Sequence, residues 1–228
     1  MRYPKLASLK LNELKSILCN CGLNVTGNKS ILVERITESL DSVKPVSNLV
    51  SVDIGLKNLA VTHLNGKKIS QWAKYDLMLD KTYDPVSYAR LLSEFINGFD
   101  FGDASFVIER QRYRTMGRSA VCDRIIHLAS VEVQLHTLLL HKTRAVEPQK
   151  VAAYYNLSPG PQKKKDSVEI VENWIKEGTD RLDFGDYRNV LKSSKKKDDL
   201  ADSLLQAVAY IEWNENLQSL KKKLDSEK

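Results

Sequence analysis

The sequence predicts an α/β protein in which a mixed five-stranded sheet is flanked by helices and preceded by a small all-α module. Three observations predict this class. Residues 8–40 carry apolar side chains at helical spacing, three short apolar runs follow one another from residue 49, and two further strand-like runs alternate with helical segments after residue 85. We expect the module to span residues 1–44 and the α/β domain to span residues 45–228.

The composition is that of an ordinary globular protein. Apolar residues make up 42% and charged residues 28% of the 228 residues, which excludes a wholly disordered or collagen-like chain. No run approaches the roughly 18 apolar residues of a membrane span, so we expect no membrane partner. The net charge of +6 is compatible with nucleic acid or with another anionic surface. The three cysteines have neither disulfide nor zinc spacing.

The expected N-terminal module consists of two short helices. Ser8 is a candidate N-cap for the first helix, and Gly22 is a candidate stop. The second helix follows Thr26-Gly27-Asn28, and its apolar residues again recur at helical spacing. Residues 41–48 are polar and include Pro45, which is typical of a linker.

The expected α/β domain begins with three strands in a meander, at residues 49–55, 58–64 and 68–77. Asn65-Gly66 is a strong signal for a hairpin between the last two. Pro85 favours the start of a helix that runs to Asn97. The remaining elements are expected in this order: a strand at 104–110, a long helix at 118–141, a strand at 143–147, and helices from 148, at 165–177 and at 198–215. We expect the last residues, KKKLDSEK, to be a frayed and solvated end.

Four carboxylates stand where burial disfavours a charge or where one helix face brings them together. Asp53 lies within a Val/Ile strand, and Glu109 ends the next buried strand, FVIE. Asp199 and Asp202 are three residues apart and therefore share a helix face. Such a cluster repels itself unless a divalent cation is present, and oxygen ligands favour Mg²⁺ or Mn²⁺. A pair of these ions is suited to phosphodiester hydrolysis.

Each carboxylate also has a simpler structural explanation. Asp199 or Asp202 alone suits the dipole at a helix N-terminus, and Glu109 could pair with a neighbouring arginine. Asp53 is the hardest of the four to explain structurally. The histidines of the 118–141 helix are most simply packing or surface residues, and the wide apolar face of that helix predicts burial against a second subunit.

The order of these segments resembles the ribonuclease H-like nuclease superfamily, with a central Asp in the first strand, a Glu ending the fourth and a D-x-x-D helix near the C-terminus. Within it, VDIGLKNLA, FVIERQ, VEPQKVAAYYNL, KKKDSV and DLADSLLQA resemble the RuvC group of Holliday-junction resolvases, specifically its fungal mitochondrial cruciform-cutting branch. The first 40 residues resemble the SAP motif through ELKSILCNCGL, Gly27, Lys29-Ser30 and LVERI.

The resemblance implies a structure-selective endonuclease that cuts four-way DNA junctions by Mg²⁺-dependent hydrolysis, with Mn²⁺ as a substitute. It assigns Asp53, Glu109, Asp199 and Asp202 as the catalytic metal ligands. Asp198 remains an alternative to Asp199, because it lies one turn from Asp202; the D-x-x-D spacing favours Asp199. The resemblance also implies a homodimer, a mitochondrial location and no nucleotide cofactor.

Basic residues around the carboxylates fit a nucleic-acid substrate. VIERQRYRTMGR holds Arg110, Arg112 and Arg114 with Tyr113 among them, and such a group can hold phosphates and stack on an unpaired base. Lys163, Lys164 and Lys165 precede the helix expected at 165–177 and resemble the basic loop that faces the scissile phosphate in RuvC. Lys29 is the candidate DNA contact of the SAP-like module. A solvated charge run and a loop-anchoring tyrosine are the structural alternatives.

Three other functions remain open from the sequence. A related ribonuclease H-like nuclease could act on RNA, and a junction-binding protein could keep its carboxylates for structure alone. VDIG-x-x-N is also similar to the phosphate loop of actin-like phosphotransferases, but the chain has no second Asp-Gly phosphate loop and no Walker motif.

Overall fold

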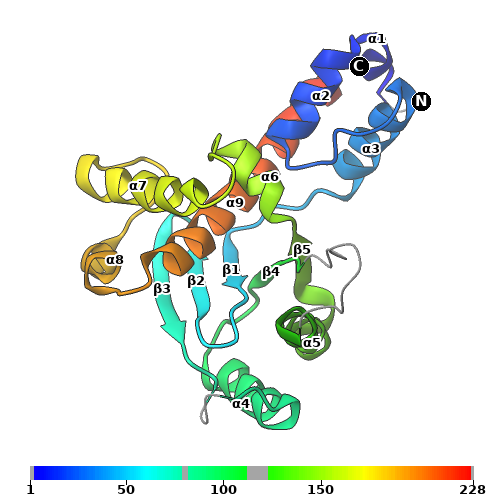
Figure 1. Ribbon diagram of the computed structural model, residues 1–228. Coiled ribbons are helices and arrows are strands. Elements are labelled where there is room, and N and C mark those ends of the chain that lie inside the picture. The colour runs from blue at the N-terminus through cyan, green and yellow to red at the C-terminus, as the bar shows by residue number, and fades with distance from the viewer. Residues whose placement is uncertain (1–2, 79–81, 112–122, 227–228) are drawn as a thin grey trace.

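The computed structural model describes residues 3–78, 82–111 and 123–226 of the chain (Figure 1). Its centre is a five-stranded mixed sheet in the order β3-β2-β1-β4-β5. The strands are β1 (Asn48–Asp53), β2 (Leu59–Asn65), β3 (Lys68–Tyr75), β4 (Ser105–Glu109) and β5 (Thr143–Val146). The first three pair antiparallel, whereas β4 and β5 continue the sheet in parallel with β1. The predicted fold class and all five strands are confirmed.

The hairpin between β2 and β3 turns at the expected dipeptide. Asn65 pairs with Lys68, and Gly66 adopts a φ of 58°, which glycine reaches without steric cost. Along β1, the side chains alternate between two cores: Leu49 packs on one face of the sheet, and Val50 and Val52 pack on the other. This alternation explains why the first strand reads as a continuous apolar run.

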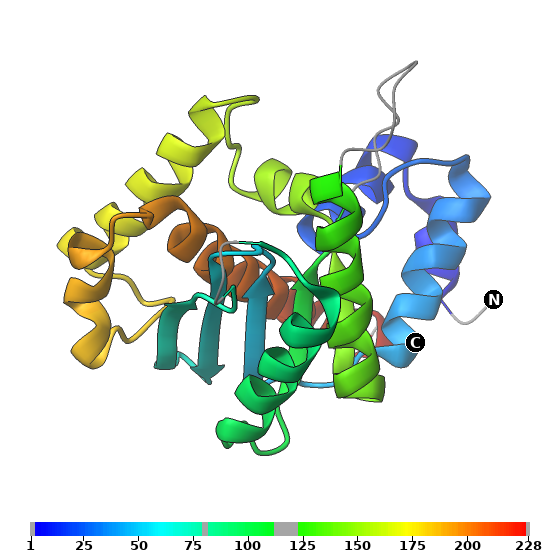
Figure 2. The same ribbon diagram turned by 60° about the horizontal axis from the view of Figure 1, so that its bottom comes forward.

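Helices cover both faces of the sheet (Figures 1 and 2). On one face lie α4 (Pro85–Gly98) and α5 (Asp123–Leu139), which continues into the 3-10 turn η1 (Leu140–Lys142). The other face carries α6 (Pro148–Tyr154), α7 (Gln162–Glu177), η2 (Gly185–Asn189), α8 (Val190–Ser193) and the 30-residue α9 (Lys197–Ser226). Pro85 begins α4 as predicted, with Asp84 as N-cap. No helix of the described residues is long and apolar enough to cross a membrane.

The N-terminal module contains α1 (Pro4–Ser8), α2 (Leu11–Asn20) and α3 (Lys29–Ser42). The predicted N-cap Ser8 is wrong: α2 begins at Leu11 after Lys10, and the Ser8 hydroxyl donates to Lys5 O within α1. Gly22 follows the end of α2 with a φ of 64°, as a helix stop requires.

The end of α9 completes the core of this module. Leu217 and Leu224 are buried there together with Leu14, Leu32 and Ile36. The prediction of a frayed end is therefore wrong, because the apolar residues of the last α9 turns pack against α2 and α3. Figure 1 shows α9 running from the sheet into the module. The division of the chain into domains at residues 1–44 and 45–228 stays a prediction.

Candidate active site

Two carboxylates meet at one edge of the sheet because their strands are parallel neighbours. Asp53 ends β1 and Glu109 ends β4, and the register pairs Val52 with Ile108 immediately before them. After Asp53 the chain turns tightly at Gly55, where a Cβ atom would lie 2.4 Å from Asn58 O. Glycine at this position therefore lets the loop fold back beside the carboxylate.

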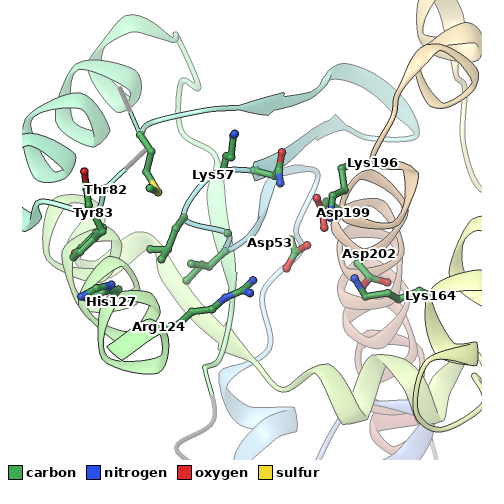
Figure 3. A pocket seen from close by; sticks show the side chains of 15 residues that line it. Asp53, Lys57, Thr82, Tyr83, Arg124, His127, Lys164, Lys196, Asp199 and Asp202 are labelled. Atoms are coloured by element: carbon green, nitrogen blue, oxygen red, sulfur yellow. The ribbon is translucent and has the colours of Figure 1, made fainter. Parts of the chain in front are cut away.

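Helix α9 brings the other two carboxylates to the same edge. Two buried hydrogen bonds fix its first turns on the sheet: Ser203 Oγ lies 2.9 Å from Thr62 Oγ1, and Trp72 Nε1 donates to Leu200 O at 3.0 Å. Asp202 borders a small cavity of about 20 Å³ with Asp53 and Glu109. Asp199, Asp202 and Asp53 also line a larger open cleft of about 590 Å³, in which Figure 3 shows the three side chains converging.

The carboxylates perturb one another strongly. Burial raises the pKa of Asp53 well above its usual range, and the neighbouring carboxyl of Glu109 and the charges of Asp202 and Asp199 raise it further. The edge of the sheet therefore concentrates carboxylates that repel one another, as expected of a site for a cation.

The structure distinguishes Asp198 from Asp199. Burial raises the pKa of Asp198, but its hydrogen bond and ion pair with Lys164 outweigh this and lower it overall. Burial and the charge of Asp198 raise the pKa of Asp199. Among the described residues, nothing hydrogen-bonds the buried Asp199 Oδ2. Asp199 thus has a carboxylate oxygen without a partner, whereas Asp198 already has a lysine partner.

The lysines of the expected basic loop lie in the first turn of α7, because α7 begins at Gln162. The prediction that they precede the helix is wrong. The helix begins before its first apolar residue, so the apolar spacing of the sequence does not mark its start. Lys163 Nζ lies 3.5 Å from Asp202 Oδ2 and borders the small cavity. Lys164 lines the larger cleft, and Lys165 lines the neighbouring groove between α7 and the start of α9.

A second wall of the cleft was missed by the sequence reasoning. Figure 3 shows Arg124 and His127 of α5 across the cleft from the α9 carboxylates. The His127 ring stacks on Tyr83, with centroids 4.3 Å apart. Exposed Lys57 lines the same cleft from the loop after β1. The i, i+3 spacing of Arg124 and His127 places them on one helix face, but nothing in the sequence turns that face toward Asp53.

Two of the remaining predicted DNA contacts, Arg110 and Lys29, lie away from this cleft. Arg110 is exposed and lines a different groove, between β4 and α5, with Glu132 and His136. Arg112, Tyr113 and Arg114 lie outside the described residues. Lys29 begins α3 and is exposed on the N-terminal module.

The donor set suits a divalent cation of the Mg²⁺ class. Within the residues that the structure describes, no three Asp, Glu, His or Cys side chains are already close enough to hold one ion. The four carboxylates nevertheless supply only hard oxygen donors, Asp53 is repelled by its neighbours, and Asp199 has an unpartnered oxygen. A bound cation would relieve both features.

Comparisons with known proteins identify the family of the chain. The family model described as "Mitochondrial resolvase Ydc2 / RNA splicing MRS1" matches residues 49–159 and 149–220, and the SAP domain model matches residues 5–41. The mitochondrial cruciform cutting endonuclease 1 of Schizosaccharomyces pombe is 26% identical, over 93% of this chain and 95% of that protein.

Two further matches bear on fold and on function. The crystal structure of the yeast mitochondrial Holliday junction resolvase Ydc2 superimposes with a TM-score of 0.72 at 23% identity, covering 96% of this chain and 99% of that one. The mitochondrial transcription elongation factor of Rattus norvegicus is 24% identical over 75% of this chain and 52% of that protein. The first match shows a shared fold, and the second shows a similarity that extends beyond nucleases.

Proposed function

This chain belongs to the mitochondrial resolvase Ydc2 and RNA splicing MRS1 family, and from that premise we propose that it is an endonuclease that resolves four-way DNA junctions in mitochondria. The observation that carries the proposal is the convergence of Asp53, Asp199 and Asp202 on one cleft, with Glu109 beside Asp53. Because the family name includes a splicing protein, membership alone does not distinguish cleavage from binding. The cluster of carboxylates supports cleavage for this chain.

In this proposal, Asp53, Glu109, Asp199 and Asp202 hold two divalent cations, Mg²⁺ by preference. When bound, such ions activate water and stabilise the leaving oxygen of a phosphodiester. Asp53 and Glu109 are held by the strand ends and give the site a fixed floor. Lys163, which lies 3.5 Å from Asp202 Oδ2, and Lys164, which pairs with Asp198, are suited to contact a phosphate that would enter the cleft.

The wall of α5 would hold the DNA strand on the other side of the cleft. Arg124 and Lys57 are suited to the phosphates that flank the cut, and the Tyr83–His127 stack offers an aromatic surface to a base. Arg110 would contact the junction outside the cleft, and Lys29 would add affinity from the SAP domain. Arg112, Tyr113 and Arg114 stay proposed DNA contacts on the strength of the sequence alone.

A junction needs two symmetric cuts, so we propose a twofold homodimer with one site in each subunit. Ile126, Val133 and Leu140 recur every seven residues along α5 and η1, and they are 52%, 61% and 65% exposed. A solvent-exposed stripe of this kind is suited to an interface between subunits. Val133→Glu should convert the dimer to a monomer in analytical ultracentrifugation; an unchanged sedimentation coefficient would place the interface elsewhere.

The test of the proposed function is a comparison of substrates. The full chain with Mg²⁺ should nick a synthetic four-way junction at paired, symmetric positions, and it should leave linear duplex DNA and RNA/DNA hybrids intact under the same conditions. EDTA should abolish cleavage. Preferential cutting of the hybrid would instead indicate a nuclease that acts on RNA.

The match to mitochondrial transcription elongation factors favours a second candidate, a nucleic-acid-binding protein that does not cut. It predicts tight junction binding with no cleavage in Mg²⁺ or Mn²⁺. The clustering of Asp53, Glu109 and Asp202 around one small cavity argues against it, because burial and mutual repulsion of these carboxylates destabilise a protein that has no use for a cation there.

A further inference from the structure

A buried amide lies directly beneath the carboxylates. Gln206 is only 4% exposed and lies on α9 four residues after Asp202 and seven after Asp199, on the same helix face. It borders the small cavity that Asp53, Glu109 and Asp202 also line. The aliphatic residues around it on α9 make a glutamine exceptional at this depth in the core.

The amide joins the helix to the two strands that carry the other carboxylates. Gln206 Nε2 donates to Ser51 Oγ at 3.0 Å, to Val52 O at 3.2 Å and to Val107 O at 3.4 Å. Two N–H groups thus serve three acceptors, so one of the bonds is shared. Val52 O belongs to the peptide that immediately precedes Asp53, and Val107 lies two residues before Glu109.

The other buried polar contacts of α9 are made elsewhere on the sheet. Ser203 bonds to Thr62 on β2, and Trp72 on β3 bonds to Leu200 O. These contacts fix α9 over the antiparallel half of the sheet. Gln206 fixes it over β1 and β4, where the distance between helix and strand ends sets the spacing of the carboxylates.

We propose that Gln206 is a positioning residue, which holds Asp199 and Asp202 at the distance from Asp53 and Glu109 that binding of a divalent cation requires. The inference rests on the proposed function, and it assigns Gln206 no contact with substrate or cation. A group that orients metal ligands from behind typically changes metal affinity about 10- to 100-fold when it is lost. Its effect therefore appears in cation binding rather than in stability alone.

The test is Mn²⁺ binding to the full chain without DNA, followed by the electron paramagnetic resonance of free Mn²⁺. Gln206→Met keeps a similar volume and removes the three hydrogen bonds, and it should weaken Mn²⁺ binding about 10- to 100-fold. Leu217→Ala is the control, since it truncates a buried side chain of the same helix in the core of the N-terminal module, away from the carboxylates. It should lower Tm and leave Mn²⁺ binding unchanged.

Cleavage gives a second readout. In Gln206→Met, the Mg²⁺ concentration for half-maximal cleavage of the junction should rise, and kcat at saturating Mg²⁺ should recover most of the wild-type value. If Gln206→Met does not fold, Ser51→Ala removes one of the same hydrogen bonds from the strand side. It should weaken Mn²⁺ binding, whereas Leu217→Ala should not.

Two outcomes overturn the proposal: unchanged Mn²⁺ affinity in folded Gln206→Met, or equal weakening in the control at an equal loss of Tm. Either would make Gln206 a purely structural residue while leaving the proposed nuclease intact. A wild-type chain that binds no Mn²⁺ and needs no divalent cation for cleavage would overturn the cation site itself, and the role of Gln206 with it.

Discussion

The two ends of helix α9 differ in what they bury. Near its N-terminus, the face toward the sheet carries Asp199, Asp202 and Gln206, polar groups whose placement burial makes costly. Near its C-terminus, Leu217 and Leu224 enter the core of the SAP domain. The helix has 30 residues and an axis of about 45 Å, and Asp202 and Leu217 lie about 22 Å apart along it. One helix therefore carries a site that lowers stability at one end and a contact that raises stability at the other. Substitutions at the two ends should affect activity and stability separately.

The largest effect is expected at the polar end. Asp202→Asn should lower the cleavage rate by more than about 100-fold, because loss of a ligand exceeds the effect typical of residues behind the ligands. Its free energy of unfolding should stay at or above that of the wild type, since the change removes a charge that raises the pKa of Asp53. Single-turnover cleavage and urea unfolding measure the two quantities. A strongly destabilised Asp202→Asn would contradict the view that the polar end of α9 serves activity rather than stability.

At the apolar end, the effects should be reversed. Leu217→Ala should lower the free energy of unfolding by about 2–5 kcal/mol, the usual result of truncating a buried leucine. Below the unfolding transition, junction cleavage should remain close to wild type. Glu215→Ala, at a more exposed position of the same helix, is the control and should be nearly neutral. A loss of cleavage that exceeds the loss of folded protein would show that the two ends are coupled.

The contact between α9 and the SAP domain can also be strained from the other side. A Cβ atom on Gly22 would lie 2.2 Å from the ring of Trp213, and the φ of 64° disfavours any other residue there. Gly22→Ala should therefore cost about 1–3 kcal/mol of stability. Gly178→Ala provides a control with positive φ but open space around the new methyl group. Equal losses of Tm in both variants would show that backbone strain, rather than Trp213, decides the effect.

In the absence of metal, the pH dependence of stability should differ between the wild type and a variant of the carboxylate cluster at the polar end of α9. Because burial and Glu109 raise the folded-state pKa of Asp53, the folded state holds this proton more tightly than the unfolded state does. The free energy that folding loses by keeping Asp53 ionised is absent at pH values below its unfolded-state pKa. This loss grows as the pH rises toward the folded-state pKa of Asp53. In EDTA, Asp53→Asn should thus gain Tm over the wild type as pH increases, and Mg²⁺ should reduce that gain by stabilising the wild type. A Tm difference that is independent of pH would contradict the assignment of the charge cluster.

The smallest effect is expected on the exposed surface of the SAP domain. Lys29→Ala should weaken junction binding at low salt and reduce the slope of log affinity against log salt by about 1, as the loss of one phosphate contact does. Its cleavage rate at saturating protein should be unchanged. Fluorescence anisotropy at several salt concentrations measures the slope; an unchanged slope would remove Lys29 from the DNA contact surface.

The sequence was sufficient for the parts of the fold that local rules decide. Asn65-Gly66, Pro85 and the alternating strand residues predicted the hairpin, the start of α4 and the sheet, and each is where it was expected. Errors occurred where tertiary contacts override local pattern. The last turns of α9 look polar and frayed until Leu217 and Leu224 meet the SAP core, and Ser8 caps no helix because its hydroxyl bonds within α1.

The candidate site also contains residues that the sequence predicts and residues that only the tertiary structure reveals. The sequence alone indicates the four candidate carboxylates, because an acidic residue in an apolar strand and two acidic residues on one helix face are both local patterns. These residues are Asp53, Glu109, Asp199 and Asp202. The opposite wall of Arg124 and His127 could not, since it depends on how α5 packs against the sheet. The role of Gln206 likewise depends on which strand atoms lie beneath it.

The central claim is that the carboxylates of the cleft catalyse the cleavage of four-way junctions. The alternative is a protein that binds junctions and does not cut them. The most direct measurement compares wild type and Asp202→Asn on one four-way junction, recording binding and strand cleavage in Mg²⁺ at equal protein concentration. The account predicts equal binding, paired symmetric nicks with wild type, and no nicks with Asp202→Asn. Tight binding by both proteins without cleavage in Mg²⁺ or Mn²⁺, or equal cleavage by both, would contradict it.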